Sequence, residues 1–166
     1  MPKEPKQIDD LFHEALKDIY FAEKKILSAL PKMAKAAEAE ELAAALEKHV
    51  EETEEHVSRL DQVFELIDKQ PHGKNCPAIL GIIEEGQEIM KEYKGSPALD
   101  AGLLAAAQAV EHYEISRYGT LRAWAQQMGL KEAVRLLGQT LEEEKKTDAA
   151  LTKLAEQAMN AKAEAA

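Results

Sequence analysis

The stretch from Glu40 to Asp68, EELAAALEKHVEETEEHVSRLDQVFELID, decides the fold class of this 166-residue chain. Its core-facing positions recur at intervals of four and three residues, which is the spacing of one face of an α-helix. These positions are Leu42, Leu46, His49, Thr53, His56, Leu60, Val63 and Ile67. Two histidines therefore share a largely apolar helical stripe. Glu52 lies beside them, three residues after His49 and four before His56.

Helix is expected outside this stretch as well, because alanine, glutamate, lysine and leucine dominate the chain, and no strand is predicted. A first long helix should begin at residue 9 or 10 and end near Glu38. Pro31 should kink this helix without ending it, because the apolar spacing continues beyond the proline. Residues 69–77 carry two prolines and a glycine and should form a loop, followed by a shorter helix to about Tyr93.

Two more long helices complete the chain. Residues 95–97 combine a stop glycine, an N-cap serine and a proline suited to the first helical position, so a fourth helix should run from there to Gly129. The fifth helix should begin at Leu130. The leader at residues 1–7 and the tail at residues 159–166 are expected to fray. At about 100–200 residues per domain, the chain is expected to form one domain. The order of its helices indicates a four-helix bundle with a crossover connection that carries the short helix.

Every long helix of this bundle carries an acidic side chain in or beside its core-facing stripe. The acids are Glu23, Glu52, Glu111, Glu114, Glu144 and Asp148. A single acid in a stripe is more often a side chain that reaches the solvent, and a single histidine is more often a hydrogen-bonded boundary residue. Six carboxylates at one level would cost several kcal/mol of desolvation each, against a total stability of about 5–15 kcal/mol, unless protons or cations neutralise them.

Metal ions are the neutralising partners that this residue set indicates. Six carboxylates with up to two imidazoles match the demand of two hard first-row cations. Zinc would take fewer oxygen ligands, and calcium is disfavoured because histidine ligands suit iron and manganese better. The sequence therefore predicts two iron or manganese ions bound between the long helices.

Composition limits the other classes of partner. With 31 acidic and 21 basic residues the net charge is −10, which argues against binding nucleic acid or an anionic membrane surface. The apolar runs are too short for a membrane-spanning helix. Cys76 is the single cysteine, so no intramolecular disulfide can form, and the first residues lack the apolar core of a secretory signal. A cytoplasmic protein is the expectation from these features.

Six short segments resemble the YciF/YciE-type bacterial stress proteins, and the resemblance extends from about Ile8 to Ala158. The blocks Val-Glu-His-Tyr-Glu and Leu-Glu-Glu-Glu-Lys are the most specific. The segments are residues 18–24, 49–53, 59–63, 110–115, 118–120 and 140–145. The resemblance implies the ferritin-like, rubrerythrin-related superfamily, a di-iron or di-manganese carboxylate site within the bundle, and a homodimer.

The superfamily ligand pattern is Glu, then Glu-x-x-His, then Glu or Glu-x-x-Glu, then Glu-x-x-His. Glu23 matches the first element, and Glu111 with Glu114 matches the third. The second element departs from the pattern, because Glu52 precedes His56 by four residues, while His49 and Glu52 are three apart in reversed order. The fourth also departs, because Glu144 is followed at four residues by Asp148 and by no histidine.

These observations lead to one functional hypothesis and two alternatives. The hypothesis is a stress-associated di-metal protein that reacts with peroxide or dioxygen. Glu52 and either Glu111 or Glu144 would bridge the metals, and Glu23, Glu114, Asp148 and one histidine would be terminal ligands, with His56 favoured over His49. One alternative is a manganese catalase-like activity. The other is a non-enzymatic dimer with a degenerate site that stores metal or binds a partner.

Overall fold

The computed structural model describes residues 4–165, which form helices joined by short loops and contain no strand. None of the described helices combines the length and the apolar character needed to cross a membrane. The elements are α1 (Ile8–Ala36), α2 (Glu40–Leu66), α3 (Pro77–Glu92), α4 (Leu99–Gln127), α5 (Lys131–Leu154), one π-helical turn (Ala155–Met159) and α6 (Asn160–Ala165). The predicted all-α class is confirmed.

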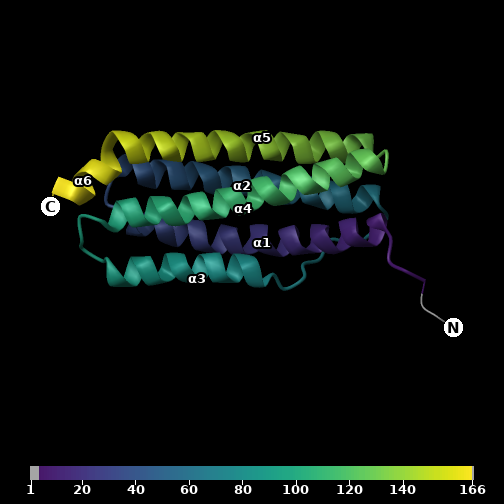
Figure 1. Cartoon of the computed structure of the whole chain (residues 1–166), viewed down its shortest axis with the longest axis horizontal. Helices are drawn as coiled ribbons and strands as arrows, with labels where there is room; N and C mark the ends of the chain where they lie inside the picture. The colour runs from purple at the N-terminus through teal and green to yellow at the C-terminus, as the bar shows by residue number, and fades with distance from the viewer. Residues whose placement is uncertain (1–3, 166) are drawn as a thin grey trace.

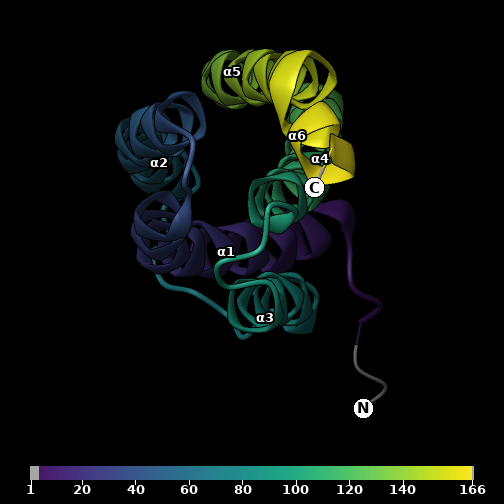
Figure 2. The same ribbon diagram turned by 90° about the vertical axis from the view of Figure 1, so that its left-hand side faces the viewer.

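The four long helices lie alongside one another and enclose one core (Figures 1 and 2). Helix α1 runs antiparallel to α2, and α4 runs antiparallel to α5. The connection between α2 and α4 returns along the bundle through α3, which packs on the outer side of α1 and α4 (Figure 2). The expected ferritin-like four-helix bundle, with a crossover that carries a short extra helix, is therefore confirmed.

Close packing of α3 on the bundle depends on a glycine in α4. A Cβ placed on Gly102 would lie 2.7 Å from Cγ2 of Ile89, so only glycine allows this approach of the two helices. Ile79 of α3 is fully buried in the core. The crossover helix is thus part of the packed domain and holds the two antiparallel helix pairs together.

Helix boundaries agree with the sequence predictions to within a few residues. The differences concern the start of α4 and the C-terminal tail. Pro31 lies inside α1 and does not end it, as predicted. Helix α4 begins at Leu99 and not at Pro97, because the hydroxyl of Ser96 accepts a hydrogen bond from the Ala98 amide in a preceding turn.

The tail at residues 159–165 is part of the helical structure. Helix continues to Ala165, because the buried side chain of Met159 anchors this segment and Lys162 forms an ion pair with Glu38 at 3.4 Å. In the leader, residues 4–7 are exposed and non-helical, while residues 1–3 and residue 166 lie outside the described part of the chain.

The start of α2 is capped by a side chain from another helix. Its N-cap residue, Ala39, has no side chain that can accept a hydrogen bond. Asp100 of α4 accepts hydrogen bonds from the backbone amides of Glu38 and Ala39, both at 2.8 Å, and is itself only 1% exposed. This buried carboxylate satisfies donors that the helix leaves free and fixes the α1–α2 connection against α4.

We predict that Asp100→Ala lowers the free energy of unfolding by about 2 kcal/mol, because two backbone donors lose a charged acceptor. Chemical denaturation followed by circular dichroism measures this loss. The control is Asp9→Ala at an exposed position in the first turn of α1, which should change stability by less than about 0.5 kcal/mol. Equal stability of the Asp100 variant and the parent would contradict the capping role.

Candidate metal centre

Six ionisable side chains meet inside the bundle at the middle of its length. Each of them is at most 2% exposed, and all four long helices contribute. Every one of the six was among the eight candidates that the sequence suggested. They are Glu23 of α1, His49 and His56 of α2, Glu111 and Glu114 of α4, and Glu144 of α5.

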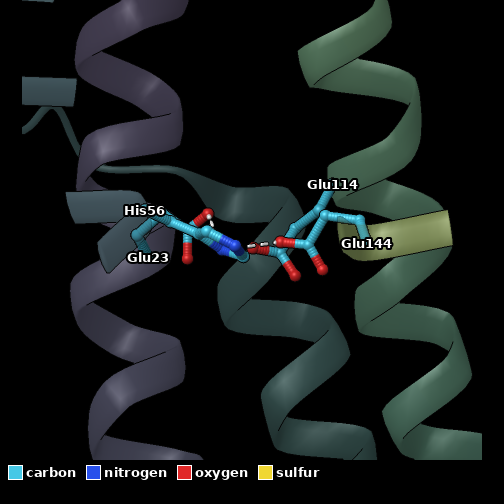
Figure 3. Close-up of side chains that lie close together, drawn as sticks. All are labelled: Glu23, His56, Glu114 and Glu144. Carbon is cyan, nitrogen blue, oxygen red and sulfur yellow. Dashed lines mark ion pairs between the residues drawn. The ribbon is translucent and has the colours of Figure 1, made fainter. Parts of the chain in front are cut away.

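The six side chains form two groups of four that share two members. In one group, potential ligand atoms of Glu23, His56, Glu114 and Glu144 lie within 4.8 Å of one another. Figure 3 shows these four side chains pointing toward a common point from α1 and α2 on one side and α4 and α5 on the other. His49 and Glu111 form the second group with the same Glu114 and Glu144. The arrangement contains two adjacent positions, each with one imidazole.

Glu144 faces both histidines, one with each of its oxygens. Oε1 lies 2.9 Å from Nδ1 of His56, and Oε2 lies 3.7 Å from Nε2 of His49. Nε2 of His49 also lies 2.8 Å from Oε1 of Glu111. A carboxylate placed in this way can hold two cations side by side, one through each oxygen.

Many of the polar atoms at this centre have no hydrogen-bond partner among the described residues, although several stand at ion-pairing distance. The unpartnered atoms are Oε2 of Glu23, Nε2 of His49, Nδ1 of His56, Oε2 of Glu111 and all four side-chain oxygens of Glu114 and Glu144. Their lone pairs converge without the alignment that a hydrogen bond needs. Buried polar atoms left in this state are costly, and metal coordination would satisfy them.

Burial and neighbouring charges shift the pKa values of the side chains at this centre. Burial raises the pKa of Glu23 and raises that of Glu114 well above its usual range. Burial and the contact with Glu111 raise the pKa of Glu144 to about 7. For His49 burial alone would lower the pKa, but the contacts with carboxylates outweigh burial and raise it. The side chains therefore retain protons that a bound cation would displace.

Two of the eight sequence candidates lie outside both groups. Glu52 is 24% exposed in its side chain and contacts Nδ1 of His49 at 3.4 Å, a contact that lowers the pKa of Glu52 to about 2. Asp148 is 22% exposed and contacts His112 Nε2 at 3.1 Å and Gln108 Nε2 at 3.2 Å. Glu52 thus stands behind a histidine of the centre, and Asp148 lies at the partly exposed edge between α5 and α4.

Two side chains that contact the centre from outside had no predicted role at it, Tyr118 and Glu143. Tyr118 is fully buried and donates a hydrogen bond of 2.6 Å to Oε1 of Glu23. Its position four residues after Glu114, in the same helical stripe, was a usable signal. Glu143 lies 2.9 Å from Nε2 of His56 and is bound by Arg59. No pattern marked Glu143, because a run of three glutamates resembles a solvated face.

Comparison with known proteins gives the family. The model of the family described as Domain of unknown function (DUF892) matches residues 7–164. The chain belongs to the DUF892 family. Protein YciF of Escherichia coli (strain K12) is 46% identical to this DUF892 chain over 160 residues, which are 96% of the chain and 96% of that protein.

Solved structures agree with this membership of the DUF892 family. The crystal structure of the E. coli stress protein YciF matches with a TM-score of 0.88 at 44% identity, over 94% of this chain and 99% of that chain. YcfI from Rhodopseudomonas palustris, named as a candidate structural protein, matches with a TM-score of 0.87 at 45% identity, over 92% of this chain and 97% of that chain. A protein from Xanthomonas campestris pv. campestris shares the fold. It matches with a TM-score of 0.69 at 22% identity, over 90% of this chain and 92% of that chain.

We predict that the metal-free protein loses stability as the pH rises from about 4.5 to 7, in the window where Glu144 is ionised in the unfolded chain but protonated in the folded one. Glu144→Gln removes this proton linkage. The stability of this variant relative to the parent should therefore rise by up to about 3 kcal/mol across the window.

Urea unfolding at a series of pH values in the presence of a chelator measures this difference. Glu142→Gln is the control, because Glu142 is an exposed neighbour that pairs with Lys145. A pH-independent difference between Glu144→Gln and the parent would contradict the raised pKa.

Proposed function

We propose that this DUF892 protein is a di-metal carboxylate protein that holds two iron or manganese ions. Glu23 and His56 would hold one ion, His49 and Glu111 would hold the other, and Glu114 and Glu144 would be shared between them. The observation that carries the proposal is that Glu144 turns one oxygen toward each histidine while neither oxygen has a hydrogen-bond partner among the described residues.

This ligand set revises the roles expected from the sequence. Glu52 was expected to bridge the metals, but its partly exposed side chain stands behind His49, whereas Glu114 is fully buried and belongs to both groups. Both histidines become ligands, because each has one ring nitrogen among the carboxylates. Asp148 is left out of the set.

Charge and donor type support iron or manganese. Four carboxylates, when ionised, carry four negative charges, which two divalent cations balance. A mixture of four carboxylates and two imidazoles suits first-row cations of intermediate hardness, whereas calcium prefers oxygen ligands alone. Zinc at a structural site is usually bound by four protein ligands without shared carboxylates. The six side chains thus fit a pair of redox-active ions better than they fit either of these.

Such ions, when bound, would supply the electrons for reducing peroxide or dioxygen. The chain would bind the ions, orient their ligands and keep water out of the site. All six donors are at most 2% exposed, so bulk water is excluded, and the hydroxyl of Tyr118 holds Glu23 by a hydrogen bond. We therefore propose a peroxidase- or oxidase-like oxidoreductase with a role in stress, working as a single-domain cytoplasmic homodimer. The E. coli relative, described as a stress protein, supports the physiological part.

A non-enzymatic role is the second candidate. The R. palustris relative is named as a candidate structural protein, and a pair of buried metal ions can serve to hold four helices together. The two candidates differ in turnover and not in metal content, so they need separate experiments.

We predict that metal-replete protein holds about two Mn(II) or Fe(II) ions per chain. Glu114→Gln and Glu144→Gln should lose both ions, because each side chain serves both positions. His49→Ala and His56→Ala should each lose one. Elemental analysis after gel filtration measures the content, with circular dichroism to verify that each variant is folded. Asp148→Asn is the matched control and should retain both ions. A parent protein that retains none when both metals are offered in excess would overturn the proposal.

We predict that the Fe- or Mn-loaded protein consumes hydrogen peroxide, or consumes dioxygen when reduced, faster than the same amount of free metal. Glu114→Gln should abolish the difference. Oxygen evolution from peroxide without a reductant would identify a catalase-like reaction, and dependence on a reductant would identify a peroxidase. Full metal content with consumption no faster than that of free metal would reject the enzyme and favour the storage or structural role.

A further inference from the structure

The two histidines of the centre are turned in opposite senses. His56 directs Nδ1 toward Oε1 of Glu144 at 2.9 Å and Nε2 toward Oε2 of Glu143 at 2.9 Å. His49 directs Nε2 toward Oε1 of Glu111 at 2.8 Å and Nδ1 toward Oε2 of Glu52 at 3.4 Å. Each ring therefore has one nitrogen inside the centre and the other on a carboxylate outside it, but the identity of the inner nitrogen differs.

Glu143 is fixed from its other side by an arginine. The Arg59 guanidinium donates two hydrogen bonds to the two oxygens of Glu143, at 2.7 and 2.9 Å, and a third to Oγ1 of Thr140 at 3.2 Å. A planar guanidinium in this fork geometry holds a carboxylate in one orientation. Arg59 is on α2 and Glu143 is on α5, so the contact also joins the helix that carries His56 to α5.

The charge of Glu143 decides which nitrogen of His56 carries the proton in the metal-bound state. A carboxylate paired with arginine is ionised and can only accept hydrogen bonds. Nε2 must therefore donate to it, and the lone pair of a neutral His56 is left on Nδ1, which is the nitrogen that faces Glu23 and Glu144.

The environment of His49 follows the same rule with the nitrogens exchanged. Glu52 accepts a hydrogen bond from Thr147 Oγ1 at 3.1 Å and forms an ion pair with Lys48 at 3.3 Å, so it too acts as an acceptor. Its partner on the ring is Nδ1, which leaves the lone pair of His49 on Nε2. The longer 3.4 Å contact makes this support looser than the one that Glu143 gives His56.

We propose that Glu143, held by Arg59, is a positioning residue that keeps the proton of His56 on Nε2 and aims Nδ1 at the metal position beside Glu23, while Glu52 positions His49 to bind through Nε2. This inference rests on the proposed function, because it concerns the ligands of the two metals. It assigns a role to three side chains outside the ligand set and makes the two metal positions inequivalent.

The decisive measurement is nuclear magnetic resonance of the ¹⁵N-histidine-labelled full chain loaded with Zn(II), a diamagnetic ion that accepts imidazole and carboxylate ligands. Long-range couplings between ring nitrogens and carbon-bound protons identify the protonated nitrogen of each ring. The expected result is a proton on Nε2 of His56 and on Nδ1 of His49. The same protonated nitrogen in both rings, or the reverse assignment, would overturn the inference while leaving the metal centre intact. Failure of Zn(II), Mn(II) and Fe(II) alike to bind would overturn both proposals.

Substitution tests the positioning role independently. Glu143→Ala should weaken the binding of one of the two Mn(II) ions by about 10- to 100-fold and leave the binding of the other unchanged, as measured by isothermal titration calorimetry. Glu143→Gln keeps a carbonyl acceptor for Nε2 and should lose less. The adjacent Glu142→Ala is the matched control and should bind as the parent does. Unchanged affinity in Glu143→Ala, or an equal loss in Glu142→Ala, would contradict the positioning role.

Discussion

Desolvation of four carboxylates in the middle of a helical bundle is the constraint on which the rest of this structure depends. An isolated buried carboxylate costs several kcal/mol, and neighbours of like charge add to that cost. The bundle cannot lower the cost by exposing these side chains, because leucines and isoleucines of the same stripes fix how each helix turns toward the core. Neutralisation has to come from protons, from the two imidazoles or from cations.

The surroundings of the centre supply order as well as neutralisation. Tyr118 binds Glu23, Arg59 binds Glu143, and Thr147 binds Glu52, so side chains that contact the inner groups are themselves held. Ligands that are oriented before a cation arrives lose little conformational freedom when it binds. A storage site needs affinity alone. A reacting centre needs more, because its geometry has to persist while its charge changes. The order seen here, in which each histidine contacts a carboxylate outside the centre, meets that need.

Most of the fold and much of the site could be predicted from the sequence, and the errors have a common cause. The four-and-three spacing places a residue on a helix face only to within about 50°. Glu111 and Glu114 are three residues apart and are both buried, whereas Glu144 and Asp148 are four apart and only Glu144 is buried. Rotation of each helix about its axis decides between such neighbours, and packing against the other helices sets that rotation. The role of Glu143 depends on a partner 84 residues away, which no local pattern reveals.

The crossover connection also determines the order in which this centre can assemble. Helices α1 and α2 form one hairpin, and α4 and α5 form another, each stabilised by contacts between helices that follow one another in the sequence. Contacts of that kind form early in folding, whereas pairing over long sequence separations is slow. The contacts that define the centre join His56 to Glu144 and Tyr118 to Glu23, so they can appear only when the two hairpins dock. Docking is therefore the step at which the chain must bury its acids, so protons or cations that neutralise these acids favour docking as well as the finished protein.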